Sequence, residues 1–328
     1  MRQNIVYQTN LYSNQKRKNF TPLTERELLG FVGINFVMGY HKLPSWTDYW
    51  KLDRDLAVPL VAETMPRNRF AKVLSNLHIN DNSSIPPGNK DKLFKIRPLI
   101  TSMNENYAKL YNVSPKVSID ESMILFKGRS TLKQYNPKKP IKRGYKLWMR
   151  ADMDGYISKF DIYQGKSVTQ DVEGVPNKFG LGERVIYNLT ADLKNKNHQV
   201  FCDNYFSSVP LMEYLKDNGI MACGTIRSDR KGLPKGMKAD KDLGRGEHDF
   251  RISDTGIGYY KWMDNKAVHM VSNFHGSEVS FVYRTQKDGS KKEFSCPTVV
   301  KNYNQDMGGV DKADMLCSIH GLGRKSKK

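Results

Sequence analysis

The chain has 328 residues and a formal net charge of +19, from 53 lysines and arginines against 34 aspartates and glutamates. This balance indicates a polyanionic partner, most commonly nucleic acid, although a ribosomal or merely soluble basic protein shares it. The 17 Tyr, 14 Phe and 4 Trp exclude a disordered basic tail. No apolar run is long enough for a signal peptide or a membrane span. We therefore expect a soluble, intracellular protein.

The four cysteines lie far apart in the sequence and form no CxxC pair, so we expect no zinc site in this chain. Scattered single cysteines are typical of reduced core residues in an intracellular protein. They are Cys202, Cys223, Cys296 and Cys317.

The first part of the chain is predicted to be helical. Thr24 followed by Glu27 is a capping box, and it begins a helix that we expect to be buried. Further helices are predicted over residues 65–81 and 94–113, the last ending near Ser114. The apolar residues expected to fill the first helix are Leu28, Phe31, Val32, Ile34, Phe36 and Val37.

At Lys116 the pattern changes to strands. A hairpin is predicted to turn at Asp154–Gly155, and Ser208 is predicted to cap a helix that ends at Gly219. The tail from Pro297 is predicted to contain one more helical segment. Strands are predicted within residues 116–126, 144–165, 198–206, 220–228 and 256–285. This order indicates an α+β core of the nuclease type that is interrupted by an insertion.

Acidic residues follow or end these strand signals. Asp120 is predicted at the end of one strand, Asp203 follows another, and Asp311 and Asp314 lie on the last helix. If the two strands are neighbours, a helix over the sheet edge brings all four carboxylates together. Clustered carboxylates favour Mg²⁺ or Mn²⁺, and two such ions support phosphodiester cleavage. Each aspartate taken singly also fits a structural strand end or helix cap.

A basic segment, residues 127–146, begins seven residues after Asp120 and contains no acidic residue. Its cations can neutralise phosphates, its aromatic rings can stack on bases, and Pro137 and Pro140 stiffen it. The alternative is a solvated surface loop. The candidate DNA-binding residues are Lys127, Arg129, Lys133, Tyr135, Lys138, Lys139, Lys142, Arg143 and Lys146.

Three long blocks resemble the signature of the piggyBac transposase family. They are SIDESMILFKGRSTLKQYNPKKPIKRGYKLW, FCDNYFSSVPLMEYLKDNGIMACGTIRSDRKGLP and VVKNYNQDMGGVDKADMLCS, in the family's order and separation. MGYHKLPSWTDYW and MPRNRFAKVLSNLHIND resemble its upstream helical region, so the resemblance covers nearly the whole chain.

The resemblance implies an RNase H-like catalytic core of the DDE/D kind. It implies cut-and-paste transposition: hydrolytic nicking at transposon ends, hairpin formation on the element and joining into TTAA targets. It assigns catalysis to Asp120, Asp203, Asp311 and Asp314, with the first three as ligands of a two-metal site. It also implies double-stranded DNA as partner and a homodimer on that DNA.

The implied domains are residues 1–115, helical for DNA binding and dimerisation; 116–228, the first part of the core; 229–298, the β-rich insertion; and 299–328, the second part of the core. Family members continue beyond this point and carry an acidic N-terminal region, so the chain resembles a shortened derivative. Whether it is an active enzyme is therefore left open. The alternatives are a domesticated or decayed DNA-binding protein without catalysis and a structure-specific nuclease. We expect a nuclear protein, and the basic end GRKSKK fits nuclear import.

Overall fold

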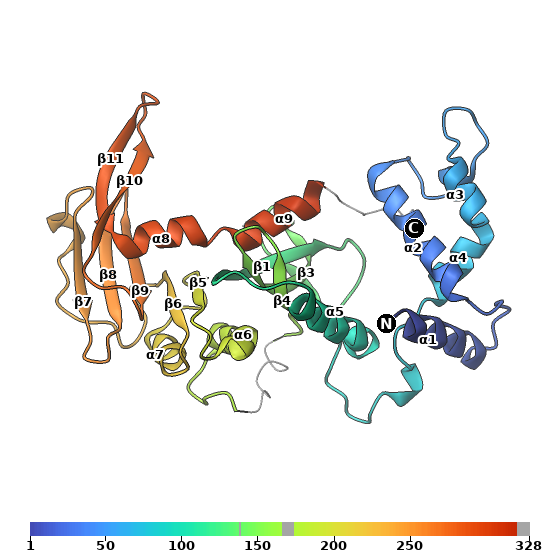
Figure 1. Cartoon of the computed structure of the whole chain (residues 1–328), viewed down its shortest axis with the longest axis horizontal. Coiled ribbons are helices and arrows are strands. Elements are labelled where there is room, and N and C mark those ends of the chain that lie inside the picture. Colours follow the sequence, from blue (N-terminus) through green and yellow to red (C-terminus); the bar gives the residue numbers. More distant parts are fainter. Residues whose placement is uncertain (138, 166–173, 320–328) are drawn as a thin grey trace. The chain divides into compact units, whose positions relative to one another are not determined.

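The computed structural model describes residues 1–137, 139–165 and 174–319 (Figure 1). The chain divides into two compact units: residues 1–106 together with the chain from Met315, and residues 107–314. The four-domain division drawn from the sequence stays a prediction. Within the described residues, no helix combines the length and apolar character needed to cross a bilayer.

The first unit is helical. Thr24 begins α2 as expected: its hydroxyl accepts a hydrogen bond from the Glu27 amide, and the Glu27 carboxylate accepts one from the Thr24 amide. This capping box satisfies two amides that the helix itself leaves unpaired. The α-helices are α1 (Arg2–Gln15), α2 (Glu25–Tyr40), α3 (Pro59–Thr64), α4 (Arg67–Asn76) and α5 (Arg97–Leu110), with short 3₁₀ turns η1 (Asp48–Trp50), η2 (Asn82–Ser84) and η3 (Phe94–Ile96).

The prediction that six apolar residues of α2 fill a buried helix is wrong for two of them. Leu28, Phe31 and Ile34 are buried, but Val32 is 40% exposed and Phe36 is 55% exposed. At 3.6 residues per turn only one stripe of a helix can face the core of its own unit, and Val32 and Phe36 lie off that stripe. The buried stripe packs against Phe70 and Val73 of α4 in one hydrophobic cluster. The prediction that α4 presents one apolar face is confirmed in this way.

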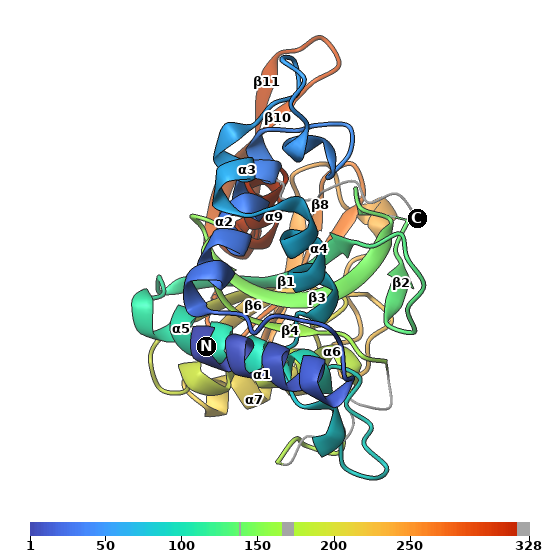
Figure 2. The ribbon, with the colours of Figure 1, turned by 90° about the vertical axis from the view of Figure 1, so that its right-hand side faces the viewer.

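The second unit is built on a mixed sheet, which confirms the predicted α+β class. Strands β4, β3 and β1 pair antiparallel in that order, while β1, β5 and β6 pair parallel. Figure 2 shows β1, β3 and β4 side by side. The strands are β1 (Lys116–Leu125), β2 (Lys133–Tyr135), β3 (Arg143–Asp152), β4 (Ile157–Ile162), β5 (Gln199–Cys202) and β6 (Met221–Thr225). The hairpin turn at Asp154–Gly155 lies between β3 and β4, as predicted.

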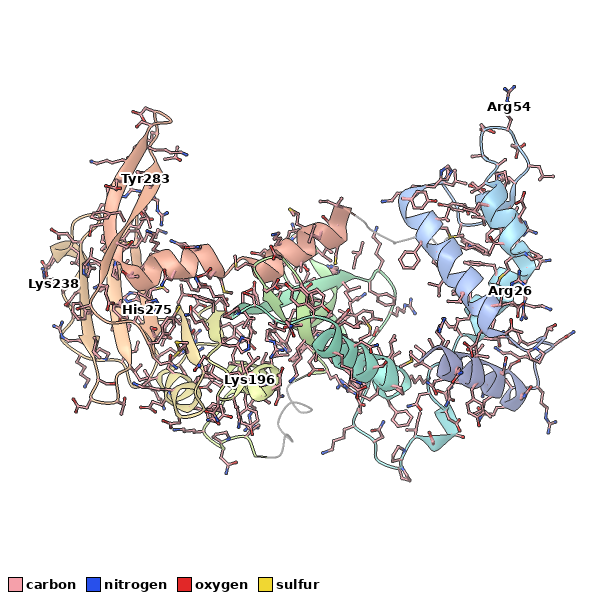
Figure 3. The ribbon with its side chains drawn as sticks, viewed as in Figure 1. Arg26, Arg54, Lys196, Lys238, His275 and Tyr283 are labelled. Atoms are coloured by element: carbon pink, nitrogen blue, oxygen red, sulfur yellow. The ribbon has the colours of Figure 1, made fainter. Side chains whose placement is uncertain are left out.

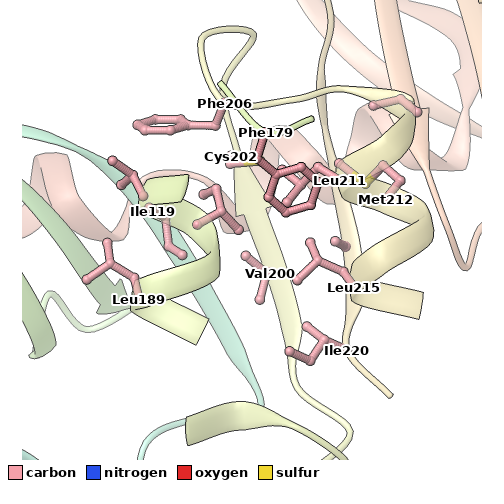
Figure 4. Packing of buried hydrophobic residues seen from close by; sticks show 14 of the residues in the cluster. Ile119, Phe179, Leu189, Val200, Cys202, Phe206, Leu211, Met212, Leu215 and Ile220 are labelled. Carbon is pink, nitrogen blue, oxygen red and sulfur yellow. The ribbon is translucent and has the colours of Figure 1, made fainter. Parts of the chain in front are cut away.

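Two helices cover one face of this sheet, α6 (Leu181–Thr190) and α7 (Val209–Asp217). Their apolar stripes pack on Ile119 and Val200 of the central strands (Figure 4). Ser208 caps α7, because its hydroxyl accepts a hydrogen bond from the Leu211 amide. The core is therefore centred on β1 and β5. Its packing holds these two strands in place, and with them the backbone positions of Asp120 and Asp203.

The predicted insertion, 229–298, continues this sheet instead of standing apart from it. Strand β9 pairs with β6, and β8 and β7 follow outward. The hairpin β10–β11 is separate, and Figure 3 shows Tyr283 on it; that side chain is 65% exposed. These elements are η6 (Asp240–Asp242), β7 (His248–Ile252), β8 (Gly258–Met263), β9 (Ala267–Ser272), β10 (Val279–Thr285) and β11 (Lys291–Pro297).

The tail forms two helices where the sequence predicted one segment, α8 (Thr298–Asp306) and α9 (Gly309–Ile319). The break lies at Met307 and Gly308, between the buried start of α8 and the acidic motif. Cys202, Cys223 and Cys296 are buried as predicted, while Cys317 on α9 is exposed, against the prediction of a core position. All four cysteines are free thiols.

Candidate active site

Asp120 and Asp203 come from adjacent parallel strands. In the register of β1 and β5, Ile119 lies beside Cys202, so the next residue on each strand is one of the two aspartates. Asp120 lies in the middle of β1, not at its end as predicted, because β1 stays paired with β3 as far as Leu125. The Asp203 carboxylate accepts a hydrogen bond from the Tyr205 amide at 2.9 Å.

Helix α9 lies against the same strand through its first turn. A Cβ built on Gly309 would stand 2.3 Å from the Asp152 carbonyl oxygen and 2.7 Å from the Ser118 hydroxyl oxygen, so only glycine permits this approach. Side chains two apart on a strand share a face, which places Ser118, Asp120 and Ser122 along one side of β1. The Ser122 hydroxyl donates a hydrogen bond to the Asp314 carboxylate. Ser122 and Asp314 both have short side chains, so this hydrogen bond holds α9 close to β1.

Lys139 of the basic segment joins the carboxylates. Its ammonium lies 3.0 Å from Asp120 Oδ2 and 3.6 Å from Asp311 Oδ1. The side chains of Lys139 and Asp120 are each 17% exposed, whereas that of Asp311 is 73% exposed. The structure therefore brings Asp120, Asp311 and Asp314 together beside the middle of β1, and Asp203 directly follows the neighbouring strand β5.

The electrostatics of this acidic site, Asp120, Asp203, Asp311 and Asp314, disfavour uncompensated negative charge. Burial raises the pKa of Asp120, although the Lys139 ammonium opposes the rise. Burial likewise raises the pKa of Asp203, against the hydrogen bond from the Tyr205 amide. Burial raises the pKa of Asp314 too, in opposition to its hydrogen bond with Ser122. Carboxylates in this state gain from a nearby cation.

A divalent metal ion fits this site by chemistry. The donors are carboxylate oxygens, which Mg²⁺ and Mn²⁺ prefer, and the Lys139 ammonium already stands as a cation between Asp120 and Asp311. Among the described residues, no three His, Cys, Asp or Glu side chains lie close enough together to hold an ion as they stand. The residues that would hold it are Asp120, Asp203 and Asp311.

The basic segment is divided between free and committed cations. Lys127, Arg129 and Lys142 are exposed. Arg143 lies over the ring of Tyr135, which is 62% exposed. Strand β2 joins the start of β3, so the middle of the segment is a β-arm and not a plain loop. The proposed DNA contacts thus include exposed cations beside an exposed aromatic ring.

Three other members of the predicted set have local partners. Lys133 donates a hydrogen bond to the Gly128 carbonyl oxygen. Lys146 forms an ion pair with Glu121 at 2.5 Å and lies 4.0 Å from the ring centroid of Trp148. Lys139 is held by the acidic site. Lys138 and the basic end GRKSKK lie outside the described residues. The DNA-binding role of the set stays a prediction.

Ser122 and two arginines near Asp203 were not among the residues predicted from the sequence. Ser122 could have been found from the alternation along β1, since it shares a face with Asp120. Arg227 and Arg230 line a pocket of about 250 Å³ together with Asn204 and Tyr205. The Arg230 guanidinium donates hydrogen bonds to the backbone carbonyl oxygens of Asn204 and Tyr205 at 3.2 and 3.0 Å. Both arginines follow β6, the strand that pairs with β5, and this position in the sequence could have indicated that they lie near Asp203.

The sequence and the fold both match transposases. A family model described as Transposase IS4 matches residues 1–328. The human piggyBac transposable element-derived protein 3 is 36% identical over 333 residues, covering 99% of this chain and 55% of that protein. The human piggyBac transposable element-derived protein 2 is 31% identical over 318 residues, covering 94% of this chain and 52% of that protein.

The chain therefore spans about half the length of these two human relatives. A solved structure, the piggyBac transposase synaptic complex with hairpin DNA determined by cryo-electron microscopy, matches with a TM-score of 0.81 and 26% identity. The match covers all of this chain and 67% of that one. The chain belongs to the IS4 transposase family and, within it, to the piggyBac transposases and their derived proteins.

Proposed function

We propose that this chain is the catalytic part of a metal-dependent, cut-and-paste DNA transposase that nicks transposon ends and joins them into TTAA sites. The observation that carries the proposal is the convergence of Asp120, Asp203 and Asp311 from two adjacent parallel strands and one helix. Adjacent strands of a rigid sheet hold side chains precisely enough for chemistry on a phosphodiester. The solved relative in complex with hairpin DNA supports DNA as the substrate class.

The residues divide the work in this proposal. Asp120, Asp203 and Asp311 hold divalent metal, which when bound activates water and stabilises the leaving oxygen. Ser122 orients Asp314, which then fixes the position of α9 beside the site. The exposed cations Lys127, Arg129 and Lys142 hold the phosphates of the bound DNA. Nuclear location and action as a homodimer belong to the same proposal.

A second candidate function is a transposon-derived DNA-binding protein without catalysis. The observation that favours it is the set of human relatives, which are named transposable element-derived proteins. Such a protein keeps the basic segment and has no use for the four aspartates, of which Asp120, Asp203 and Asp314 are held at an electrostatic cost by burial. The presence of all four aspartates is why we place the enzyme first.

A nicking assay separates the two functions. The purified chain is incubated with Mg²⁺ or Mn²⁺ and DNA ending in the terminal repeats of its element, beside Asp120→Ala and Asp203→Ala. The control is Asp254→Ala, an exposed aspartate of the turn between β7 and β8. The proposal predicts metal-dependent nicks from the wild type and the control only. DNA binding without nicks would establish the second function, and nicks from both site variants would refute the site.

A further inference from the structure

Lys139 differs from the exposed cations of the basic segment in where its charge lies. Its ammonium is within 3.0 Å of Asp120 and 3.6 Å of Asp311, and its side chain is only 17% exposed. Lys142, three residues further along, is exposed and has no ion pair among the described residues. Lys139 thus belongs to a segment whose cations can bind phosphates, but its side chain points toward Asp120 and Asp311, two of the proposed metal ligands.

The ammonium and a divalent ion compete for the same oxygens. The Asp120 carboxylate attracts either the Lys139 ammonium or a metal ion strongly. When one of these cations is bound, it repels the other, so both cannot bind the same carboxylate oxygen at full strength. Asp311 is 73% exposed on its side of the site, so metal can reach it from solvent. Lysine has a flexible four-carbon stem and a compact charge, which allows it to leave without refolding the strand.

The released ammonium has another anion to bind. The basic segment that carries Lys139 also carries Lys127, Arg129 and Lys142 as exposed cations. A DNA backbone held by these residues places phosphates beside the site, where a lysine gains the contact that it loses from Asp120. Metal in the site and DNA on the segment therefore favour the same position of Lys139.

We propose that Lys139 is a built-in counter-ion of the acidic site, which fills the place of the metal in the free chain and moves to a DNA phosphate when metal binds. The inference rests on the proposed function, because it takes Asp120 and Asp311 as metal ligands. It makes metal binding and DNA binding mutually reinforcing, and this coupling is reciprocal by thermodynamic necessity. Free chain then holds metal weakly, and the site is loaded only when DNA is in place.

The test is the affinity of the full chain for Mn²⁺, measured by the electron paramagnetic resonance signal of the free ion. Wild type is compared with Lys139→Met and with Lys196→Met, which removes the same charge from an exposed position outside the basic segment. Each is titrated alone and with a saturating 20-base-pair duplex of mixed sequence at low salt, because phosphate contacts weaken as salt rises. Lys139→Arg keeps the charge and serves as the conservative variant.

Without DNA, we expect Lys139→Met to bind Mn²⁺ about tenfold more tightly than wild type, a typical size for linked binding. Lys196→Met and Lys139→Arg should bind it as weakly as wild type does. The duplex should tighten Mn²⁺ binding of wild type by about the same factor and leave Lys139→Met nearly unchanged.

Equal Mn²⁺ affinities of wild type and Lys139→Met, or a wild-type affinity that the duplex does not alter, would overturn the inference. The proposed function would survive that result, because the site would still bind metal. A failure of all four proteins to bind Mn²⁺, with and without the duplex, would instead contradict the proposed function and the inference together. A Lys139→Arg protein that binds as tightly as Lys139→Met would show that packing, not charge, controls the affinity, and would also overturn it.

Discussion

Asp192 and the acidic site, both in the core unit, differ in what their carboxylates do for the fold. Asp192 of η5 (Ala191–Leu193) accepts two hydrogen bonds of 2.9 Å from the guanidinium of Arg150, a residue of β3 that is 1% exposed. In the acidic site, by contrast, the Lys139 ammonium lies 3.0 Å from Asp120 and 3.6 Å from Asp311 and is shared between these two carboxylates. Asp192 supplies the counter-charge of the buried Arg150 guanidinium, whereas the acidic site carries more negative charge than Lys139 neutralises.

The pKa shifts have opposite signs in the two places. Burial raises the pKa of Asp192, but the hydrogen bonds and charge of Arg150 outweigh it and hold that pKa well below its usual range. At Asp203 burial is the main influence, and it raises the pKa. Asp192 therefore stabilises the folded chain in its charged form, whereas charged Asp203 costs stability that a bound cation must offset.

The largest expected effect comes from breaking the Asp192 pair. Asp192→Asn leaves the Arg150 guanidinium buried without a counter-charge, and we expect a loss of about 3 kcal/mol in unfolding free energy, at the lower end for such pairs because Asp192 is 43% exposed. Denaturant unfolding at pH 7 measures it. The control is Asp229→Asn, an exposed carboxylate 3.6 Å from Arg227, for which we expect less than about 0.5 kcal/mol.

The pH dependence of this effect has a definite sign. The folded pKa of Asp192 lies below its ordinary value of 3.8, so its contribution is fully present above that value and is lost as pH falls toward the folded pKa. Wild type and Asp192→Asn should therefore converge in stability below about pH 4. A difference that stays constant between pH 7 and pH 3 would contradict the role assigned to this charge.

An intermediate effect is expected where α9 meets the sheet. Gly309→Ala places a methyl group 2.3 Å from the Asp152 carbonyl oxygen, so helix or strand must shift, and we expect a loss of about 2 kcal/mol. Gly308→Ala is the matched control, because nothing lies within 4 Å of the position of its Cβ. Thermal unfolding of the two variants should differ by several degrees. Equal melting temperatures would contradict the close approach that positions Asp311.

The smallest expected effect is a gain in stability at the acidic site. Asp203→Asn removes a charge whose folded pKa is raised, and we expect unfolding free energy to rise by about 1 kcal/mol at pH 7. For a raised pKa the favourable contribution is present below the ordinary value of 3.8 and is lost as pH rises through the folded pKa. The gain should therefore vanish below about pH 4, and a loss of stability at pH 7 would refute this sign.

Local patterns in the sequence were enough for several elements. The capping box of Thr24 and Glu27, the cap at Ser208 and the turn at Asp154–Gly155 all depend on residues within a few positions of one another. Gly155 takes a φ of +83°, which glycine adopts without strain. The apolar runs also predicted the two strands that lead to Asp120 and Asp203, although the sequence left open whether these strands pair.

Other features depend on contacts that no local pattern encodes. The inward turn of Lys139 joins a lysine of the basic segment to Asp120, 19 positions before it, and the exposure of Phe36 depends on which side of α2 the unit packs. The pair of Asp192 and Arg150 spans 42 positions. The division of the tail at Gly308 reflects the packing of Gly309 on β3, which the sequence of the tail alone does not contain.

The most direct test of the central claim is the initial rate of Mn²⁺-dependent nicking by Asp203→Asn and Asp192→Asn, measured side by side on transposon-end DNA at a temperature where both are folded. The account predicts that the more stable Asp203→Asn loses the reaction by about a thousandfold or more, the scale expected when a group at the reacting atoms is removed. It predicts that the less stable Asp192→Asn nicks at close to the wild-type rate. Nicking by Asp203→Asn at the wild-type rate, or its loss from folded Asp192→Asn, would contradict the assignment of the site.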